Sequence, residues 1–80
     1  MTRITYDEIG EALAITLHEG ASEETIEIAD GVLLDVDADG RPLSLEFVSL
    51  RSLPPFLAAH GGEYVLPERI VQTTSKRRSA

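Results

Sequence analysis

The sequence contains no cysteine and no tryptophan, and its only aromatic residues are two tyrosines and two phenylalanines. The absence of cysteine excludes disulfides, thiolate metal sites and thiol nucleophiles. No apolar run is long enough for a membrane span, so no membrane association is expected. Met1-Thr2-Arg3 leads into an alternating pattern and not into the apolar core of a signal peptide. Without a signal or a disulfide, we expect a cytoplasmic protein.

With 80 residues, the chain is long enough for one small domain. Apolar residues make up 42% of the sequence, which is too many for a disordered chain. A domain of this size buries roughly 60–65% of its unfolded surface, so we expect a stability of a few kcal/mol.

Acidic side chains outnumber basic ones, 14 to 7, and the formal net charge is -7. All the carboxylates lie within residues 1–68, and the basic residues Lys76, Arg77 and Arg78 follow them. We therefore divide the chain into a domain over residues 1–66 and a basic C-terminal tail over residues 67–80. An acidic body repels phosphate backbones, so nucleic acid is an unlikely partner for the domain. The tail is interpreted as a solvated terminus, with docking on nucleic acid or an acidic partner as the alternative.

Apolar and polar residues alternate with a period of two along most of the chain up to residue 48. The alternation predicts strands over residues 3–6, 12–17, 24–28, 32–37 and 43–48. Asp39-Gly40 predicts a hairpin turn, whereas Asp30-Gly31 is compatible with either a hairpin turn or a bulge. The expected fold class is α+β: an antiparallel β-meander of four to five strands with one face buried, and one short C-terminal helix packed on that face.

Helix signals replace the alternation after Leu50. They are a capping serine, two first-turn prolines and a terminal glycine pair: Ser52, Pro54, Pro55 and Gly61-Gly62. A helix of about two turns does not persist alone in water, so it must dock on the sheet. Its docking side would be Phe56 with Ala59, or Leu57 with Ala58. Residues 64–66 predict a short edge strand or an arm.

One acidic string matches the calcium-binding loop of EF-hands: Asp35-x-Asp37-x-Asp39-Gly40 with Glu46 six residues further. That loop should lie between two helices, yet both flanks here alternate with a period of two. Pro42 also lacks the backbone N–H that the loop uses at its position. We therefore interpret the string as a hairpin whose acids lie on the wet face, and we predict no metal site.

The two histidines, His18 and His60, lie 42 positions apart and carry no metal-ligand spacing. Serines are present, but none lies in a strained turn that would expose a nucleophile. His60 comes just before the end of the predicted helix, where a cationic side chain is favourable. We predict no catalytic residue, no cofactor and no enzymatic activity. A small hydrolase that uses His60 is the enzymatic alternative.

Two stretches of the sequence resemble a small bacterial family of unknown function, DUF2283. The shared residues are Tyr6-Asp7, Ala12-Leu13 and Ile15 in the first stretch, and Glu24-Thr25-x-Glu27, Gly31-Val32, Asp35-x-Asp37-x-x-Gly40 and Leu45-Glu46 in the second. The resemblance covers roughly residues 3–50. It implies a compact β-meander with a helix and an acidic hairpin, and it brings no established activity, cofactor or catalytic residue. Glu11, Ala14 and Ser44 depart from the family pattern but preserve the alternation.

The predicted sheet has a wide apolar face. Its members are Ile4, Tyr6, Leu13, Ile15, Leu17, Ile26, Ile28, Val32, Leu34, Val36, Leu43, Leu45 and Phe47. One short helix covers about half of such a face, so a second layer is expected. We predict a homodimer that stacks two sheets or pairs two edge strands. The alternative is an antitoxin-like or regulatory partner protein, whose acidic body faces a basic protein and whose basic tail adds docking contacts.

Overall fold

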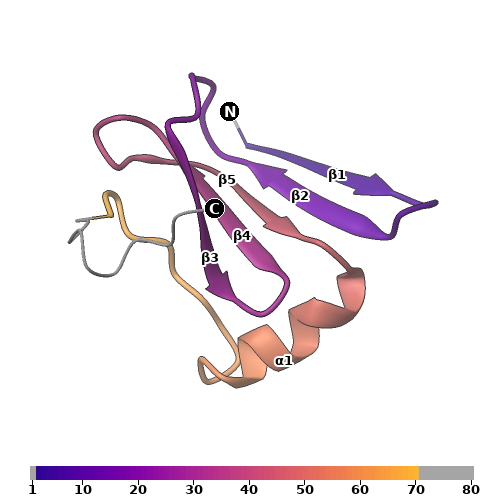
Figure 1. The fold of residues 1–80 in the computed structure, drawn as a ribbon. Coiled ribbons are helices and arrows are strands. Elements are labelled where there is room, and N and C mark those ends of the chain that lie inside the picture. The colour runs from indigo at the N-terminus through magenta and orange to yellow at the C-terminus, as the bar shows by residue number, and fades with distance from the viewer. Residues whose placement is uncertain (1, 71–80) are drawn as a thin grey trace.

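The computed structural model describes residues 2–70 and contains one antiparallel sheet and one short helical segment (Figure 1). Its elements are β1 (Arg3–Asp7), β2 (Ala12–Thr16), β3 (Glu24–Ala29), β4 (Val32–Val36), β5 (Pro42–Phe47), the 3-10 helix η1 (Leu50–Ser52) and the α-helix α1 (Leu53–Ala58). Each strand lies where the alternation predicts it, and the α+β fold class is confirmed. No helix among the described residues is long and apolar enough to cross a membrane.

The strands are ordered β1-β2-β5-β4-β3, and every neighbouring pair is antiparallel. β3, β4 and β5 form a meander, and β2 pairs with the far edge of β5, which is a Greek-key arrangement. The chain between β2 and β3 therefore crosses the ends of β5 and β4. It is held there by backbone bonds: Leu17 N donates to Leu43 O at 2.8 Å, and Glu23 N donates to Val36 O at 2.8 Å.

Of the two interpretations of Asp30-Gly31, the structure contains the hairpin turn and not the bulge. The hairpin between β3 and β4 turns at Asp30-Gly31, where Gly31 adopts a φ of 76° that favours glycine. A separate bulge lies at Ile28, because the register shifts between Glu27 and Ala29.

The strand register arranges the predicted apolar face in two rows that cross the whole sheet. One row contains Ile4, Ile15, Leu45, Leu34 and Ile26, and the other contains Tyr6, Leu13, Phe47, Val32 and Ala29. Burial is deepest in the middle of each row, on β4 and β5, where the core side chains are at most 5% exposed. It decreases toward both edges, and β1 is exposed along its length.

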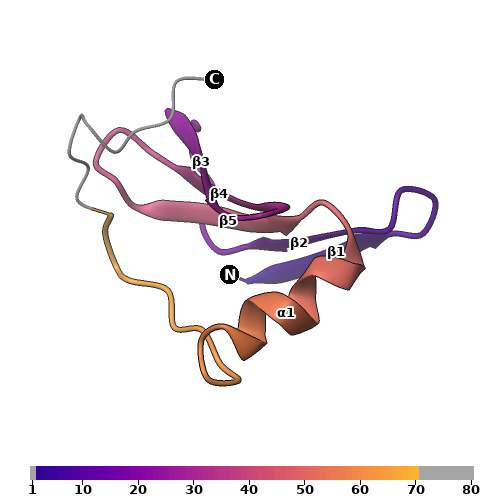
Figure 2. The ribbon, with the colours of Figure 1, turned by 60° about the horizontal axis from the view of Figure 1, so that its bottom comes forward.

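The helix covers the middle of this face through Phe56, its buried residue (Figure 2). The Phe56 ring meets Phe47 of β5 edge-on at a centroid distance of 5.6 Å. Leu53 and Leu57 are half-buried against the same core, whereas Ala59 is exposed. The docking side therefore combines Phe56 with two leucines, because these present more apolar surface than an alanine.

The start of the helical segment uses a different serine from the one predicted. Ser52 occupies the N-cap position of α1, but its side chain makes no capping hydrogen bond. The Ser49 hydroxyl caps η1 instead, by accepting the N–H of Arg51 at 3.2 Å.

After the helix, residues 63–70 form an arm and not an edge strand. The arm runs toward the β4–β5 loop (Figure 2), and Tyr64, Leu66 and Ile70 pack against the core. At its end, Ile70 N donates to Gly40 O at 2.7 Å. Gly40 has a φ of 82°, and a Cβ at this position would overlap the carbonyl oxygen of Ile70. The basic residues 76–78 of the predicted tail lie outside the described residues.

We predict that Phe56→Ala lowers the free energy of unfolding by about 3–5 kcal/mol, because it empties the contact that attaches the helix to the sheet. Urea denaturation followed by circular dichroism measures this loss. Ala59→Ser is the matched control on the exposed side and should stay within about 0.5 kcal/mol of wild type. Equal losses for the two variants would show that the helix does not anchor the fold.

Candidate functional site

The outer strand of the sheet, β1, carries apolar side chains that no other element within residues 2–70 covers. Ile4 is 67% exposed and Tyr6 is 47% exposed, although both belong to the apolar rows of the inward face. Their neighbours on β2, Leu13 and Ile15, are half-buried. We call these four residues the β1 patch. The β1 patch is exposed because Phe56 of the helix packs over β4 and β5, which supply the other residues of the buried cluster.

Further apolar side chains lie beside the same hairpin. Ile9, in the turn between β1 and β2, is 96% exposed, and its N–H donates to the Asp7 carboxylate at 3.0 Å. Leu50 is 40% exposed, and its N–H donates to Glu11 O in that turn at 2.8 Å. The apolar surface around β1 is therefore larger than the β1 patch alone.

The two edges of the sheet differ in ways that matter for association. β1 is a regular strand, because its register with β2 continues without interruption from Arg3 to Asp7. β3 carries the bulge at Ile28 and two acidic residues, Glu24 and Glu27. Bulges and like charges protect an edge from pairing with its own copy. β1 also carries two charges, Arg3 and Asp7, but they are of opposite sign and its ladder has no bulge, so β1 is the less protected edge.

The opposite face of the sheet is polar, as the alternation predicts. The register places Glu27, Leu33 and Glu46 side by side across β3, β4 and β5. In the next row, the Asp35 carboxylate accepts hydrogen bonds from the hydroxyls of Thr25 and Ser44. This face therefore presents carboxylates from three neighbouring strands.

The calcium-like string is divided between this face and the β4–β5 loop. Asp37 closes the loop: its Oδ1 accepts the N–H of Arg41 at 2.9 Å and the N–H of Asp39 at 2.9 Å. Among residues 2–70, no group of three or more histidine or acidic side chains is placed to hold a metal ion. The structure thus assigns Asp35 and Asp37 to hydrogen bonds within the hairpin.

The loop environment changes the acidity of Asp37. The N–H of Arg41 lowers the pKa of Asp37 below its ordinary value of 3.8, against the opposing effect of desolvation. The N–H of Asp39 and the positive charges of Arg41 and Arg69 lower this pKa further. The Asp37 carboxylate is therefore more stable in the folded chain than in the unfolded chain.

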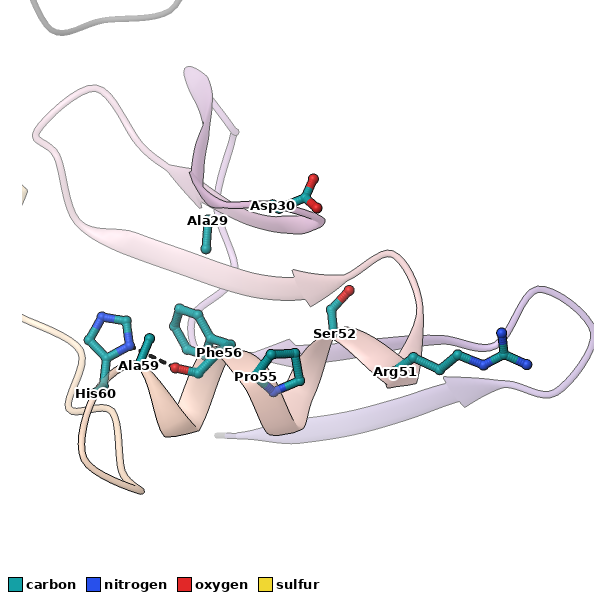
Figure 3. A pocket seen from close by; sticks show the side chains of 8 residues that line it. All are labelled: Ala29, Asp30, Arg51, Ser52, Pro55, Phe56, Ala59 and His60. Atoms are coloured by element: carbon teal, nitrogen blue, oxygen red, sulfur yellow. Dashed lines mark hydrogen bonds between the residues drawn. The ribbon is translucent and has the colours of Figure 1, made fainter.

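A shallow groove of about 410 Å³ lies between the β3–β4 turn and the helix (Figure 3). Phe56 and His60 line one end of it, and Ser52 and Arg51 lie toward the other. His60 Nδ1 donates to the Phe56 carbonyl at 2.8 Å, which places His60 at the end of the helix as predicted. The structure does not bring His18 to this groove, because His18 Nδ1 lies 3.1 Å from the carbonyl of Pro42 at the start of β5.

A family model described as Protein of unknown function (DUF2283) matches residues 3–50. The chain belongs to this family. No curated protein and no solved structure matches the chain. The residues matched by the DUF2283 model contain all five strands, whereas the helix α1 and the arm that cover the sheet lie outside them.

Alternation identifies Ile4 and Tyr6 as members of the inward face, but it does not show that they are the uncovered ones. That property depends on where the helix packs, because Phe56 contacts β5 and β2 separates β5 from β1. The only sequence signal for an exposed strand is its place at the start of the chain, far from the helix that supplies the cover.

We predict that Asp37→Ala lowers the urea midpoint at neutral pH, because the loop loses the acceptor of two backbone N–H groups. A lowered native pKa stabilises the fold above the unfolded value, and this stabilisation is lost as the pH falls through the native pKa. The difference between variant and wild type should therefore shrink as the pH falls below 3.8. Asp39→Ala removes an exposed neighbouring carboxylate but keeps the backbone N–H that donates to Asp37, so it should leave the midpoint at neutral pH unchanged. A difference for Asp37→Ala that does not vary with pH would contradict this assignment.

Proposed function

We propose that this member of the DUF2283 family acts by protein association, as a homodimer formed through β1, and that it catalyses no reaction. The observation that carries the proposal is the exposure of Ile4 and Tyr6 on a face whose other members are buried or half-buried. Contiguous exposed apolar surface commonly marks an interaction site in small proteins.

The apolar surface of the β1 patch supplies part of the free energy that association requires. Complete burial of a large apolar side chain contributes about 1.5–3 kcal/mol. Ile4 and Tyr6 are 67% and 47% exposed, so burying what remains exposed contributes on the order of 1 kcal/mol or more for each side chain. In a homodimer each residue contributes twice, because the same surface is used by both copies.

The extent of the family match supports association. Residues 3–50 form the sheet, and the helix and arm that cover its centre follow them. A sheet with one apolar face needs a second layer or an extension to bury that face. A second copy of the chain that extends the sheet beyond β1 places its own Ile4 and Tyr6 beside those of the first copy.

The non-catalytic role is supported by how the two histidines are used. One ring nitrogen of each lies within hydrogen-bond distance of a backbone carbonyl, Phe56 O for His60 and Pro42 O for His18. The His60 contact lies at the end of α1, and the His18 contact lies at the start of β5, so both rings have a structural contact. We propose the cytoplasm as the place of action, in line with the cysteine-free composition.

A regulatory partner role is the second candidate, and the polar face of the sheet favours it. Glu27, Leu33 and Glu46 place two carboxylates beside an apolar side chain, which suits a basic partner surface with an apolar centre. The β1 patch lies on the other face, so the two roles use different surfaces.

We predict that the wild-type chain sediments above its monomer mass of 8.7 kDa as its concentration rises through the micromolar range. Ile4→Lys should weaken this association at least tenfold, because a charge replaces apolar surface in the interface. Ile4 is mostly exposed in the monomer, so the variant should keep its fold. Sedimentation equilibrium with urea denaturation of each variant tests both statements.

Val65→Lys is the matched control, because Val65 is 76% exposed on the arm and lies outside the β1 patch. It should associate as wild type does. A wild-type chain that remains at 8.7 kDa up to about 1 mM would rule out the homodimer.

For the second candidate, we predict that a basic partner captured from the native cell at low salt is lost on Glu27→Lys/Glu46→Lys and retained on Ile4→Lys. Deletion of residues 72–80 should weaken the capture if the basic tail adds docking contacts. Affinity purification with the three variants in parallel measures this. Capture that survives the Glu27→Lys/Glu46→Lys change would exclude the polar face as the binding surface.

A further inference from the structure

The hydrogen-bond pattern of β2 with its two neighbours shows which backbone groups of β1 point to the open edge of the sheet. Leu17, just beyond β2, donates its N–H to the carbonyl of Leu43 on β5. In antiparallel sheets both backbone groups of a residue point to the same neighbour and the direction alternates. The odd-numbered residues of β2 therefore face β5 and the even-numbered ones face β1, where their register partners are odd-numbered. The N–H and C=O groups of Ile4 and Tyr6 thus face the open edge.

The side chains of β1 are complementary to a second, antiparallel copy of the same strand. With Thr5 placed opposite its own copy, Arg3 lies opposite Asp7 and Ile4 lies opposite Tyr6, each pair occurring twice. Opposite charges and apolar pairs directly across a ladder are stabilising. The charged pairs lie on the polar face and the apolar pairs lie on the inward face, as the registers of the monomer require.

We propose that two copies of this chain pair β1 with β1 about a two-fold axis at Thr5, so that the two sheets form one continuous antiparallel sheet. This inference rests on the proposed association and selects edge pairing over sheet stacking. The exposed backbone groups agree with it: Ile4 and Tyr6 of the two copies exchange hydrogen bonds. Thr5 then faces its copy in a non-hydrogen-bonded pair, with Cα atoms about 4.5 Å apart.

Other arrangements of two copies are less complementary. An axis at Tyr6 would place Ile4 opposite the acidic Glu8 and Thr5 opposite Asp7. Pairing through β3 about Glu27 would oppose two like charges and would meet the bulge at Ile28. Stacking of the inward faces is obstructed, because the helix α1 projects from the same face of the sheet (Figure 2).

Charge reversal tests the register. Arg3→Asp and Asp7→Arg should each weaken dimerisation about tenfold at low ionic strength, since each creates two repulsive pairs. The double variant Arg3→Asp/Asp7→Arg exchanges the partners and should return to within about threefold of wild type. In the monomer these residues lie opposite Thr16 and Ala12, which are uncharged, so the reversal creates no new charge pair across β2.

The Asp7 carboxylate also accepts the N–H of Ile9, so a second measurement independent of Asp7 is needed. The chain has no cysteine, and Thr5→Cys introduces a single thiol at the proposed axis. A Cα separation near 4.5 Å is within the range for a disulfide, so Thr5→Cys should form a covalent dimer at least tenfold faster than Thr25→Cys in a glutathione redox buffer. Thr25 is the matched control, because it lies on the polar face of the opposite edge strand.

The outcomes separate the two proposals. Rapid crosslinking at Thr5, together with rescue by the double charge reversal, supports the β1–β1 register. A wild-type dimer in which Thr5→Cys and Thr25→Cys crosslink equally slowly would overturn the register and leave the association intact. A wild-type chain that is monomeric throughout would overturn the association and the register together.

Discussion

β5 pairs with β2 along one edge and with β4 along the other, and the placement of the remaining elements follows from these two ladders. β5 is the last strand in the chain, and it lies between the β1–β2 hairpin and the β3–β4 hairpin, which both precede it in the sequence. The chain between β2 and β3 must therefore pass the ends of β5 and β4, where Leu17 and Glu23 bond to the backbone of these strands. The β1–β2 hairpin is thereby displaced to one side of the sheet.

The central position of β5 also determines which part of the sheet the helix and the arm cover. The helix begins a few residues after β5, so its anchor Phe56 meets Phe47 in the middle of the sheet and not above β1. The arm then carries Tyr64 against the Phe56 ring and continues to Ile70 and Gly40. A cover that starts from the centre and proceeds toward the β4–β5 loop protects β4 and β5 well, and it leaves Ile4 and Tyr6 in solvent.

Alternation in the sequence indicates on which face of the sheet a side chain lies, but it does not indicate which strands are neighbours in the sheet. This is why the strand positions and most inward-facing side chains could be predicted, while the bulge that replaces Ile28 by Ala29 and the insertion of β5 next to β2 could not. The helix was predictable from Pro54, Pro55 and the following glycines, since these residues act locally. Its packing through Leu53 and Leu57 depended on the direction from which the chain leaves β5. The exposure of β1 is likewise a product of topology, because a strand with the composition of β1 would be covered if it lay between β2 and β4.

The net charge of the chain bears on how two copies can meet. Each copy carries a formal charge of -7, so association must overcome repulsion, and this repulsion is smallest where the local charge is balanced. The polar face presents Glu27, Asp35 and Glu46 from β3, β4 and β5. β1 contains one arginine and one aspartate, separated by three uncharged residues. Among the five strands of residues 2–70, it is therefore the one whose two charges attract those of its own antiparallel copy. The apolar residues between these charges are the ones that the helix leaves exposed, so the electrostatic and hydrophobic terms favour the same edge.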